Sequence, residues 1–445
     1  MNSNKVLNTK ALKNIFKIPD LRDRVLFTLM MLAVYRLGIF VTTPGVDRTI
    51  MEKIMATRAD GTLLGLFNMF SGGALENLSI FALGIMPYIS ASIIMSLLAV
   101  VVPKIGELQK EGDQGQRKIT QYTRYGTVAL CLFQGVMMAK FLESLQGPAG
   151  ELVVTSPGLF FRFLTVVTLT TGTLFLMWLG EQITDRGIGN GISLLIFASI
   201  VARFPAMFYQ MGKFLNEQMI KPFHLVFFIV VMAVTFTVIV FVESSQRKIP
   251  IQYARRGGAG GRQVQNSHLP LRVNTAGVIP AIFASALLVF PATISSFFQF
   301  DMGLLQVWLS PGGWLYHLFF LGLIIFFAFF YTFVQFKTED VAENINKQGG
   351  YIPGIRPGKD TVNYINLVLS RVTFGGSIYL AAVCILPDLL RTNMGLPFYM
   401  GGTSILIVVG VAMDTASQIE SYLISNNYEG FSIGGKGSLI RSRRG

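Results

Sequence analysis

The sequence has 445 residues, of which 52% are hydrophobic and 14% are charged, and its mean hydropathy is +0.54. An average soluble protein carries about 25% charged residues, so this composition excludes a soluble globular enzyme and predicts a polytopic membrane protein. The net charge of +13 does not predict a nucleic-acid-binding protein, because the basic residues are spread over loops between apolar stretches.

Ten apolar stretches are long enough, at about 18 residues or more, to cross a bilayer as helices. They cover residues 25–42, 78–102, 125–142, 159–180, 190–211, 223–242, 275–299, 314–336, 372–390 and 401–424. Most Lys and Arg residues fall on one side of this arrangement, and the positive-inside rule then places both termini in the cytoplasm. Five spans reverse the orientation of the next five, so the count predicts two inverted halves, as in many transport proteins.

The expected organisation has a cytoplasmic N-terminus, two halves and a cytoplasmic tail. These parts are residues 1–24, a first half at 25–211 (spans 1–5), a second half at 212–424 (spans 6–10) and a tail at 425–445. The N-terminal residues lack a short apolar stretch with a cleavage site, so we expect the first span to act as the targeting signal.

The first half contains an apolar stretch at residues 61–70, about half the length of a membrane span. Ser71, Gly72 and Gly73 separate it from the second span. Broken backbone at membrane depth is tolerated only inside protein or beside a water-filled cavity. The stretch therefore either enters the membrane within a cavity or lies as a short helix on the outer surface, and the residues alone slightly favour the surface helix.

Three aliphatic pairs lie near the starts of spans that contain an interrupting Gly or Pro. They are Ile85 with Ile89, Ile192 with Ile196, and Val278 with Ile282. Residues four apart share one face of a helix. A single isoleucine in a span usually faces lipid or a neighbouring helix, but three such pairs are consistent with an apolar constriction that excludes ions by dewetting.

The second half contains two long loops, at 244–274 and 337–371, that are polar, basic and rich in Gly or Pro. In the second loop, the glycines and prolines of residues 349–358 favour a turn with Arg356 at its tip. Such loops either dock a large partner or are solvated linkers, and composition alone favours linkers.

Charged side chains are almost absent from the spans, whereas an ion-coupled transporter retains one there for a task. Asp414 and Glu420 in the last span are the exceptions. We expect Asp414 to be a buried, hydrogen-bonded or interhelical residue rather than a coupling site, and keep a solute transporter coupled through Asp414 and a structural scaffold as alternatives.

Catalytic and metal-binding motifs are not found. Cys131 and Cys384 both lie in apolar stretches, which predicts neither disulfides nor a metal site. There is no HExxH or GxSxG motif. We therefore expect no cofactor, no metal and no catalytic residue. Any energy that the function of the protein requires would come from a partner.

Several long segments resemble the SecY family of bacterial protein-conducting channel subunits, almost from end to end. They are Phe67–Ala74, Ile80–Ser92, Gln121–Gly126, Trp178–Ser193, His268–Asn274, Gly277–Ala284, Pro353–Gly358 and Gly401–Ser404. The resemblance implies an all-α membrane protein with ten transmembrane helices in two inverted, pseudo-symmetric five-helix halves around an hourglass pore. It also implies a passive channel that moves unfolded secretory polypeptides across the bacterial cytoplasmic membrane and releases transmembrane segments sideways into lipid.

The resemblance further implies where the working parts of such a channel lie. The pore ring would be Ile85, Ile89, Ile192, Ile196, Ile282 and Ile407. A re-entrant plug helix at about 61–75 would include Leu64, Leu66, Phe67, Asn68, Met69 and Phe70, which favours the cavity alternative for this stretch. A lateral gate between spans two, three, seven and eight would have Ser90 and Phe290 near its seam.

The same resemblance implies partners. They are the small subunits SecE and SecG, the ATPase SecA, the ribosome, signal sequences and nascent chains, and membrane lipid, with no nucleic acid beyond ribosomal RNA. Arg255, Arg256 and Arg356 would contact SecA or the ribosome. Residues 255–263 are unusually Gly-rich for the family, so the assignment of Arg356 is the better supported.

Overall fold

The protein is described from a computed structural model. It describes residues 18–58, 68, 71–145, 150–217, 222–253, 265–285, 287–288, 313–394 and 401–441. Within these residues, seven helices are long and apolar enough to cross a membrane, or eight if one bent pair is counted as a span.

Helices occupy nine of the predicted spans, and the remaining one contains a helix at 279–285. The span helices are α2 (Pro19–Gly38), α5 (Met86–Val101), α7 (Asp113–Ser144), α8 (Leu159–Arg186), α9 (Gly191–Val201) with α10 (Phe204–Asn216), α11 (Pro222–Ser244), α14 (Trp314–Gln335), α16 (Lys359–Met394) and α17 (Gly402–Arg441). Three shorter helices are α3 (Arg48–Arg58), α6 (Pro103–Lys110) and α15 (Thr338–Lys347). The chain bends by 105° between α5 and α6, where Pro103 begins the new helix.

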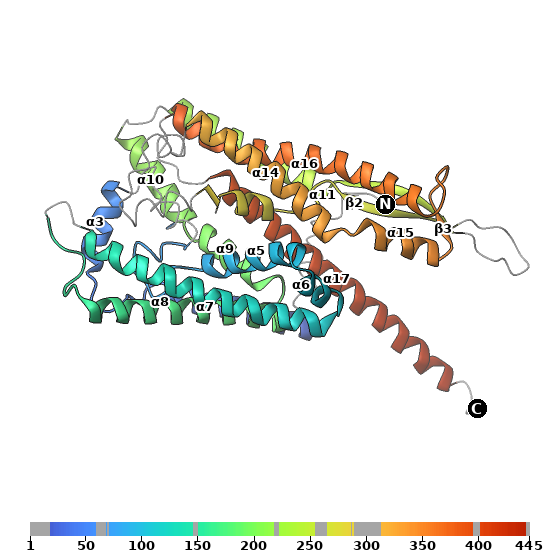
Figure 1. The fold of residues 1–445 in the computed structure, drawn as a ribbon, viewed down its shortest axis with the longest axis horizontal. Helices are drawn as coiled ribbons and strands as arrows, with labels where there is room; N and C mark the ends of the chain where they lie inside the picture. Colours follow the sequence, from blue (N-terminus) through green and yellow to red (C-terminus); the bar gives the residue numbers. More distant parts are fainter. Residues whose placement is uncertain are drawn as a thin grey trace, which may run out of the picture.

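The long helices form two groups with α17 between them (Figure 1). The first group contains α2, α5, α7, α8 and α9, and the second contains α11, α14 and α16. α17 packs against α9 of the first group and against α11 and α16 of the second. The chain therefore completes one group before it builds the other, and its last helix joins them.

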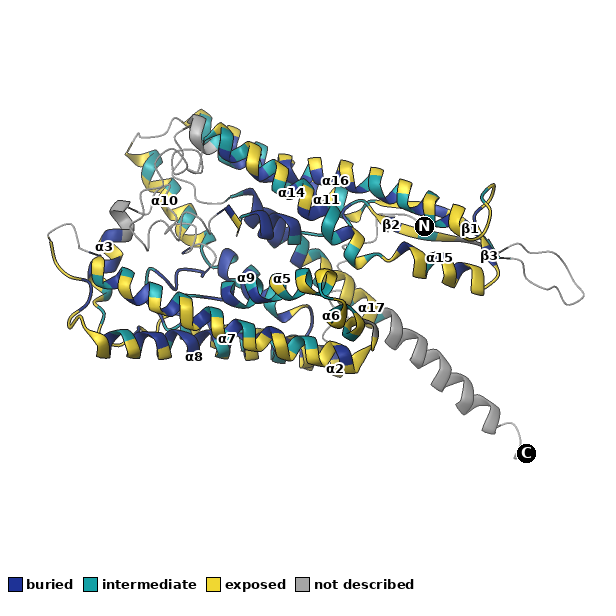
Figure 2. Cartoon of the chain, viewed as in Figure 1, coloured by how far each residue is buried: buried dark blue, intermediate teal, exposed yellow. Residues whose placement is uncertain are grey.

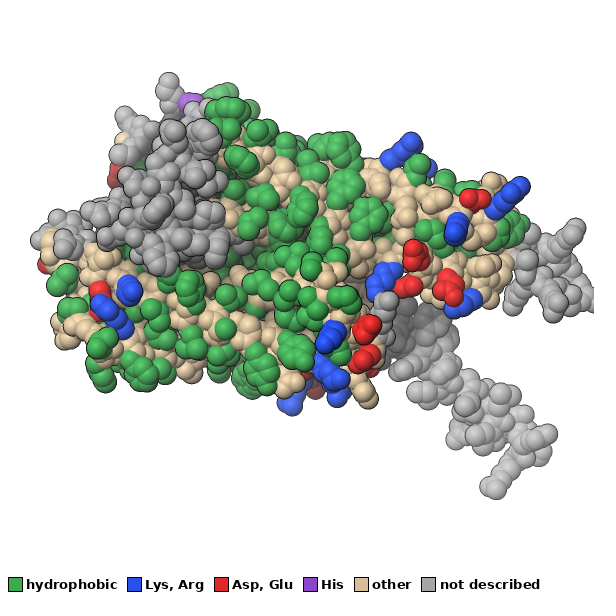
Figure 3. Space-filling view, viewed as in Figure 1, with side chains coloured by type: hydrophobic (Ala, Val, Ile, Leu, Met, Phe, Trp, Pro, Cys, Tyr) green, Lys and Arg blue, Asp and Glu red, His purple; other side chains and the backbone are tan. Residues whose placement is uncertain are grey.

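Buried residues concentrate where the two groups meet (Figure 2). The largest buried cluster includes Phe81, Leu195, Ile282, Leu380 and Ile407. The outward faces of the same helices are apolar and exposed, as Figure 3 shows for one side of the molecule. Exposed apolar side chains that cover the outward faces of long helices are typical of a surface that faces lipid.

The start of the second predicted span is not helical. Residues 71–85 form turns, and α5 begins only at Met86. Gly84 has a φ of +59°, which a helix cannot continue, and Pro87 occupies the first turn of α5. Although irregular, the turns are buried among α2, α8 and α9, as membrane-depth backbone must be.

The two predicted loops of the second half form a folded unit with a small sheet. β1 (Gln246–Tyr253) pairs antiparallel with β2 (Gln265–Arg272) and with β3 (Gly350–Tyr351), in the order β2-β1-β3. Ile249 and Ile251 alternate inward and pack with Ala342 and Ile345 of α15. The linker interpretation of these loops is therefore wrong, because they share a hydrophobic core.

Candidate functional site

Five of the six predicted ring isoleucines line one small cavity. Its lining residues are Ile85, Ile89, Ile196, Ile282 and Ile407, together with Met86. They come from four segments, namely the start of α5, α9, the helix at 279–285 and α17. The cavity has a volume of only about 10 Å³. That is about the least volume that holds one water, so the cavity is closed to any larger solute.

Four of the five isoleucines that line the cavity are buried inside the protein, and Ile89 is half-buried. Ile407 is 1% exposed, and Ile85, Ile196 and Ile282 are 6–9% exposed. Ile192 lies one turn before Ile196 on α9 but does not line the cavity, and instead lies against Gly180 of α8.

Local hydrogen bonds fix the helix starts that carry these isoleucines. The Ile89 N–H donates to the Ile85 carbonyl at 3.1 Å, so Ile85 and Ile89 lie one turn apart although Ile85 precedes the helix. The Asn190 side chain accepts from the Ser193 N–H at 3.2 Å and caps α9. The Gly189 N–H donates to Gln418 of α17 at 2.9 Å. This bond ties the start of α9 to α17, the helix that supplies Ile407.

Asn68 is the one predicted plug residue within the described part of the chain. Leu64, Leu66, Phe67, Met69 and Phe70 lie outside the described residues. Asn68 is 3% exposed; its amide donates to the Glu76 carboxylate at 3.1 Å and accepts from the Glu76 N–H at 3.1 Å. Asn68 therefore lies inside the protein.

The turns that follow Asn68 are held by polar contacts with α2 and α9. The hydroxyls of Tyr35 and Ser199 lie 2.5 Å apart, and Tyr35 also donates to the Ser71 carbonyl at 3.3 Å. Arg203, between α9 and α10, pairs with Glu76 at 3.1 Å. Residues 71–85 are thus fastened to the first group of helices.

A polar cleft separates the two groups on one side. It has a volume of about 590 Å³ and lies between α5–α6 and α14–α15. Its lining residues are Ser96, Gln109, Tyr331, Val334, Gln335, Lys337, Asp340 and Val341. Of the two predicted lateral-gate residues, Ser90 lies on α5 and is half-buried, and Phe290 lies outside the described residues.

Arg356 is exposed in the turn between β3 and α16. Gly354 and Gly358 on either side have φ angles of +81° and +106°, which the turn requires and which glycine adopts without strain. The Thr361 hydroxyl donates to the Arg356 carbonyl at 3.0 Å and fixes the turn to the start of α16. Arg255 and Arg256 lie outside the described residues.

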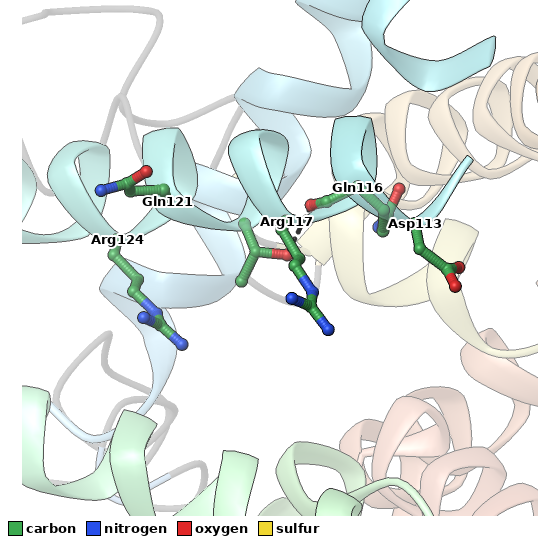
Figure 4. A pocket seen from close by; sticks show the side chains of 6 residues that line it. Asp113, Gln116, Arg117, Gln121 and Arg124 are labelled. Atoms are coloured by element: carbon green, nitrogen blue, oxygen red, sulfur yellow. Dashed lines mark hydrogen bonds between the residues drawn. The ribbon is translucent and has the colours of Figure 1, made fainter. Parts of the chain in front are cut away.

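Two charged features differ from the sequence-based expectations. Asp414 was expected to be buried, but its side chain is 71% exposed and lies 3.7 Å from Arg272, so that expectation is wrong. A cleft of about 500 Å³ along α7, lined by residues such as Arg117 and Arg124, was not predicted (Figure 4). Arg124 donates two hydrogen bonds, at 2.9 and 2.7 Å, to Glu181 of α8.

Within the described ranges, no three His, Cys, Asp or Glu side chains are placed to hold a metal ion.

Comparisons with known proteins place this arrangement in a family. The family model described as SecY matches residues 79–416. The protein translocase subunit SecY of Escherichia coli strain K12 is 49% identical over 419 residues, which cover 92% of this chain and 93% of that protein.

Two solved structures are similar in fold. One, described as the structure of a protein conducting channel, has a TM-score of 0.66 at 18% identity and covers 91% of this chain and 93% of that chain. The other, Sec61 in the canine ribosome-channel complex from the endoplasmic reticulum, has a TM-score of 0.64 at 17% identity, with the same coverage. The predicted fold class and the prediction of a channel subunit rather than an enzyme are confirmed. The chain belongs to the SecY family of protein translocase subunits.

Proposed function

We propose that this chain forms the pore through which unfolded secretory polypeptides cross a bacterial cytoplasmic membrane. The observation that carries the proposal is the convergence of five isoleucines, from α5 and α9 of the first group, from the helix at 279–285 and from α17, on a cavity with room for about one water. The pore is passive, and SecA or a translating ribosome supplies the work.

An aliphatic ring of this size excludes ions because an ion cannot keep its water shell inside it. Moving an unpaired charge from water to such surroundings costs on the order of tens of kcal/mol. Aliphatic side chains make no hydrogen bonds, so a passing polypeptide displaces them without breaking directional contacts. The ring then closes around the chain and keeps ions out during transport.

Residues at about 61–75 act as the plug in this proposal. The burial of Asn68 and its two hydrogen bonds to Glu76 support an inward path for the chain at that point. The fastened turns at 71–85 give the plug a fixed attachment to the first group of helices.

The lateral gate lies between spans two, three, seven and eight in this proposal, on the side where α5 faces α14, with Ser90 and Phe290 near its seam. The polar cleft of about 590 Å³ between these helices supports a seam on this side. An apolar signal sequence leaves through it into lipid, favoured by about 0.8 kcal/mol for each CH₂ group that leaves water.

The proposed topology has both termini in the cytoplasm and its two halves at 25–211 and 212–424. α6, α15 and the sheet lie together at one end of the molecule (Figure 1), where Lys and Arg gather on the face in Figure 3. The positive-inside rule makes this end cytoplasmic. The folded unit around β1–β3 then presents Arg356 to SecA or a ribosome. Arg255 and Arg256, in the loop at 244–274, are proposed as further contacts.

The small subunits SecE and SecG are the proposed membrane partners. An apolar groove of about 550 Å³ runs between α2 and α8, with Gly38, Thr171 and Gly172 among its lining residues. The space beside Gly38 and Gly172 is filled by Phe81 and Ile80, so the groove is bounded by apolar side chains such as those of Val34, Val167 and Phe175. The groove therefore suits a transmembrane helix of one of these subunits.

Photocrosslinking of a stalled secretory chain tests the proposed function. A photoreactive residue at Ile85 or Ile282 should crosslink to the chain, whereas one at Val230, an exposed position on α11, should not. Equal crosslinking at all three positions, or none at Ile85 and Ile282, would contradict the proposed path.

A charge reversal at Arg356 tests the partner surface. Arg356→Glu should weaken binding of SecA and slow export several-fold, because a rim charge steers association, while the exposed position leaves folding unchanged. Binding is measured by titration of SecA onto the reconstituted complex, with Lys359→Glu at the start of α16 as a nearby exposed control. Unaltered SecA affinity and export would remove Arg356 from the surface.

A further inference from the structure

Glu76 joins Asn68 to the junction between α9 and α10. The Asn68 side-chain nitrogen donates to Glu76 Oε2 at 3.1 Å, and Arg203 Nη2 donates to the same oxygen, also at 3.1 Å. Asn68 belongs to the segment proposed as the plug, whereas Arg203 is the residue directly before α10. A single carboxylate oxygen therefore accepts from both the plug and the helices around it.

The polar atoms of Asn68 are all bound within the turn that follows it. The side-chain nitrogen donates to the Glu76 carboxylate, and the side-chain oxygen accepts from the Glu76 N–H at 3.1 Å. The Asn68 carbonyl accepts from the Gly73 N–H at 3.0 Å and from the Ser71 hydroxyl at 3.2 Å. Position 68 therefore needs one side-chain donor and one acceptor at fixed places, which an amide supplies and an ionised carboxylate does not.

Arg203 fixes the carboxylate that holds Asn68. It follows α9, which packs against α8 and α17 and supplies Ile196 to the cavity. The side chains of Glu76 and Arg203 are 40% and 28% exposed. Water therefore reaches both, and the loss of one charge does not leave the other buried and unpaired. The pair can be changed by substitution without loss of the fold.

We propose that Glu76 is a positioning residue that fastens the plug at Asn68 to the α9–α10 junction, a role that rests on the proposed channel function. Hydrogen bonds to an ionised carboxylate are about twice as strong as those between neutral groups. The hold on Asn68 therefore depends on the charge of Glu76, and Arg203 keeps that charge in place.

The test uses the translocase complex with its partner subunits, with Cys131 and Cys384 replaced by Ala. Ala74→Cys, at a position that is 0% exposed, reports the fastened state in nanodiscs, because a water-soluble maleimide labels it only when the turn opens. Arg162→Gln is the matched control, since Arg162 pairs with Glu143 at 2.7 Å and joins α8 to α7 instead of to the turn.

Export of a precursor with a weakened signal sequence, driven by SecA in vesicles, reports the function. A signal sequence must displace the plug with part of its own binding free energy, so a loosened plug should favour the weakened signal. Thermal unfolding confirms that each variant complex is folded.

Asn68→Asp should raise the labelling rate about tenfold, because two carboxylates then face each other where a hydrogen bond was. Arg203→Gln should raise it about threefold, as expected for a partly exposed pair, and Arg203→Lys should raise it less because the charge is kept. Arg162→Gln should leave it unchanged. Export of the weakened precursor should rise in the same order. If Asn68→Asp does not fold, the comparison of Arg203→Gln with Arg162→Gln decides.

An exchange of the two functional groups tests the hydrogen bond itself. When Asn68→Asp is combined with Glu76→Gln, the amide at position 76 can donate to the carboxylate at position 68. Labelling should then fall at least about threefold below that of Asn68→Asp alone. The measurement is made at pH 8, so that a shared proton does not restore the bond in Asn68→Asp.

The role of Glu76 is overturned if Asn68→Asp and Arg203→Gln label no faster than Arg162→Gln, if the exchange labels as fast as Asn68→Asp, or if export of the weakened precursor does not follow labelling. Crosslinking of a stalled chain to Ile85 and Ile282 in the unmodified protein separates the two proposals. Its presence together with unchanged labelling removes only the role of Glu76, whereas its absence removes the channel function.

Discussion

The isoleucine ring and the turns at 71–85 are both buried where membrane helices meet, yet they are held in different ways. The ring consists of aliphatic side chains from four segments, without a polar group on the cavity side chains. The turns are fastened by the Tyr35–Ser199 and Glu76–Arg203 contacts. Dispersion contacts reform wherever apolar surfaces meet, whereas hydrogen bonds need fixed geometry. The comparison suggests a compliant closure beside a rigid attachment.

Replacement of Gly72 is expected to destabilise the protein more than the other substitutions below. Gly72→Ala should destabilise the protein by about 2–4 kcal/mol, because a methyl group at φ +67° is strained and would lie 2.9 Å from the Ser199 Cα. Gly112→Ala is the matched control, since Gly112 has a similar φ of +71° and open space where the added methyl group would lie. Thermal unfolding of the complex in detergent measures both. Equal losses would mean that the turns do not press against α9.

Replacement of Tyr35 is expected to have the second-largest effect on stability. Tyr35→Phe should cost about 1–2 kcal/mol, because it removes a buried hydroxyl that contacts both Ser199 and the Ser71 carbonyl. Tyr379→Phe removes a buried hydroxyl that has no hydrogen-bond partner among the described residues, and should cost less. The same unfolding assay compares the two, and a larger loss for Tyr379→Phe would contradict the rigid attachment.

A conservative change in the ring should have the smallest effect. Ile282→Leu keeps the volume and apolar character of the side chain and should cost under about 1.5 kcal/mol. Leakage should stay near background, because the cavity remains filled by aliphatic groups. A loss as large as that of Gly72→Ala would show that the ring is as rigid as the turns.

Sequence patterns were most informative where function depends on side-chain type and local spacing. The pairs Ile85 with Ile89 and Ile192 with Ile196, one helical turn apart beside Gly or Pro, pointed to a constriction. Ile407 was named only through the resemblance to the family, because its span contains several aliphatic residues four apart and spacing alone does not single it out, and Met86 was not named at all. Ile192 shows the limit of the spacing argument, since packing against Gly180 takes it away from the cavity.

Features that depend on distant pairing were not predictable. β1 contains Pro250 and several polar residues. It also pairs with β3 at Gly350, which lies about one hundred residues further along the chain. No local pattern reports such a contact. Asp414 was misplaced for a related reason, because a hydropathy stretch gives a span but not the direction in which each of its side chains points.

The ion permeability of vesicles that contain the complex with Ile282→Asp tests the central claim most directly. The charged side chain would hydrate the cavity, so leakage should rise at least about tenfold over the unmodified protein and over Ile282→Leu, with the complex still folded. Leakage at the unmodified level in a folded Ile282→Asp complex would contradict the account, since the isoleucines would then not be what keeps ions from passing.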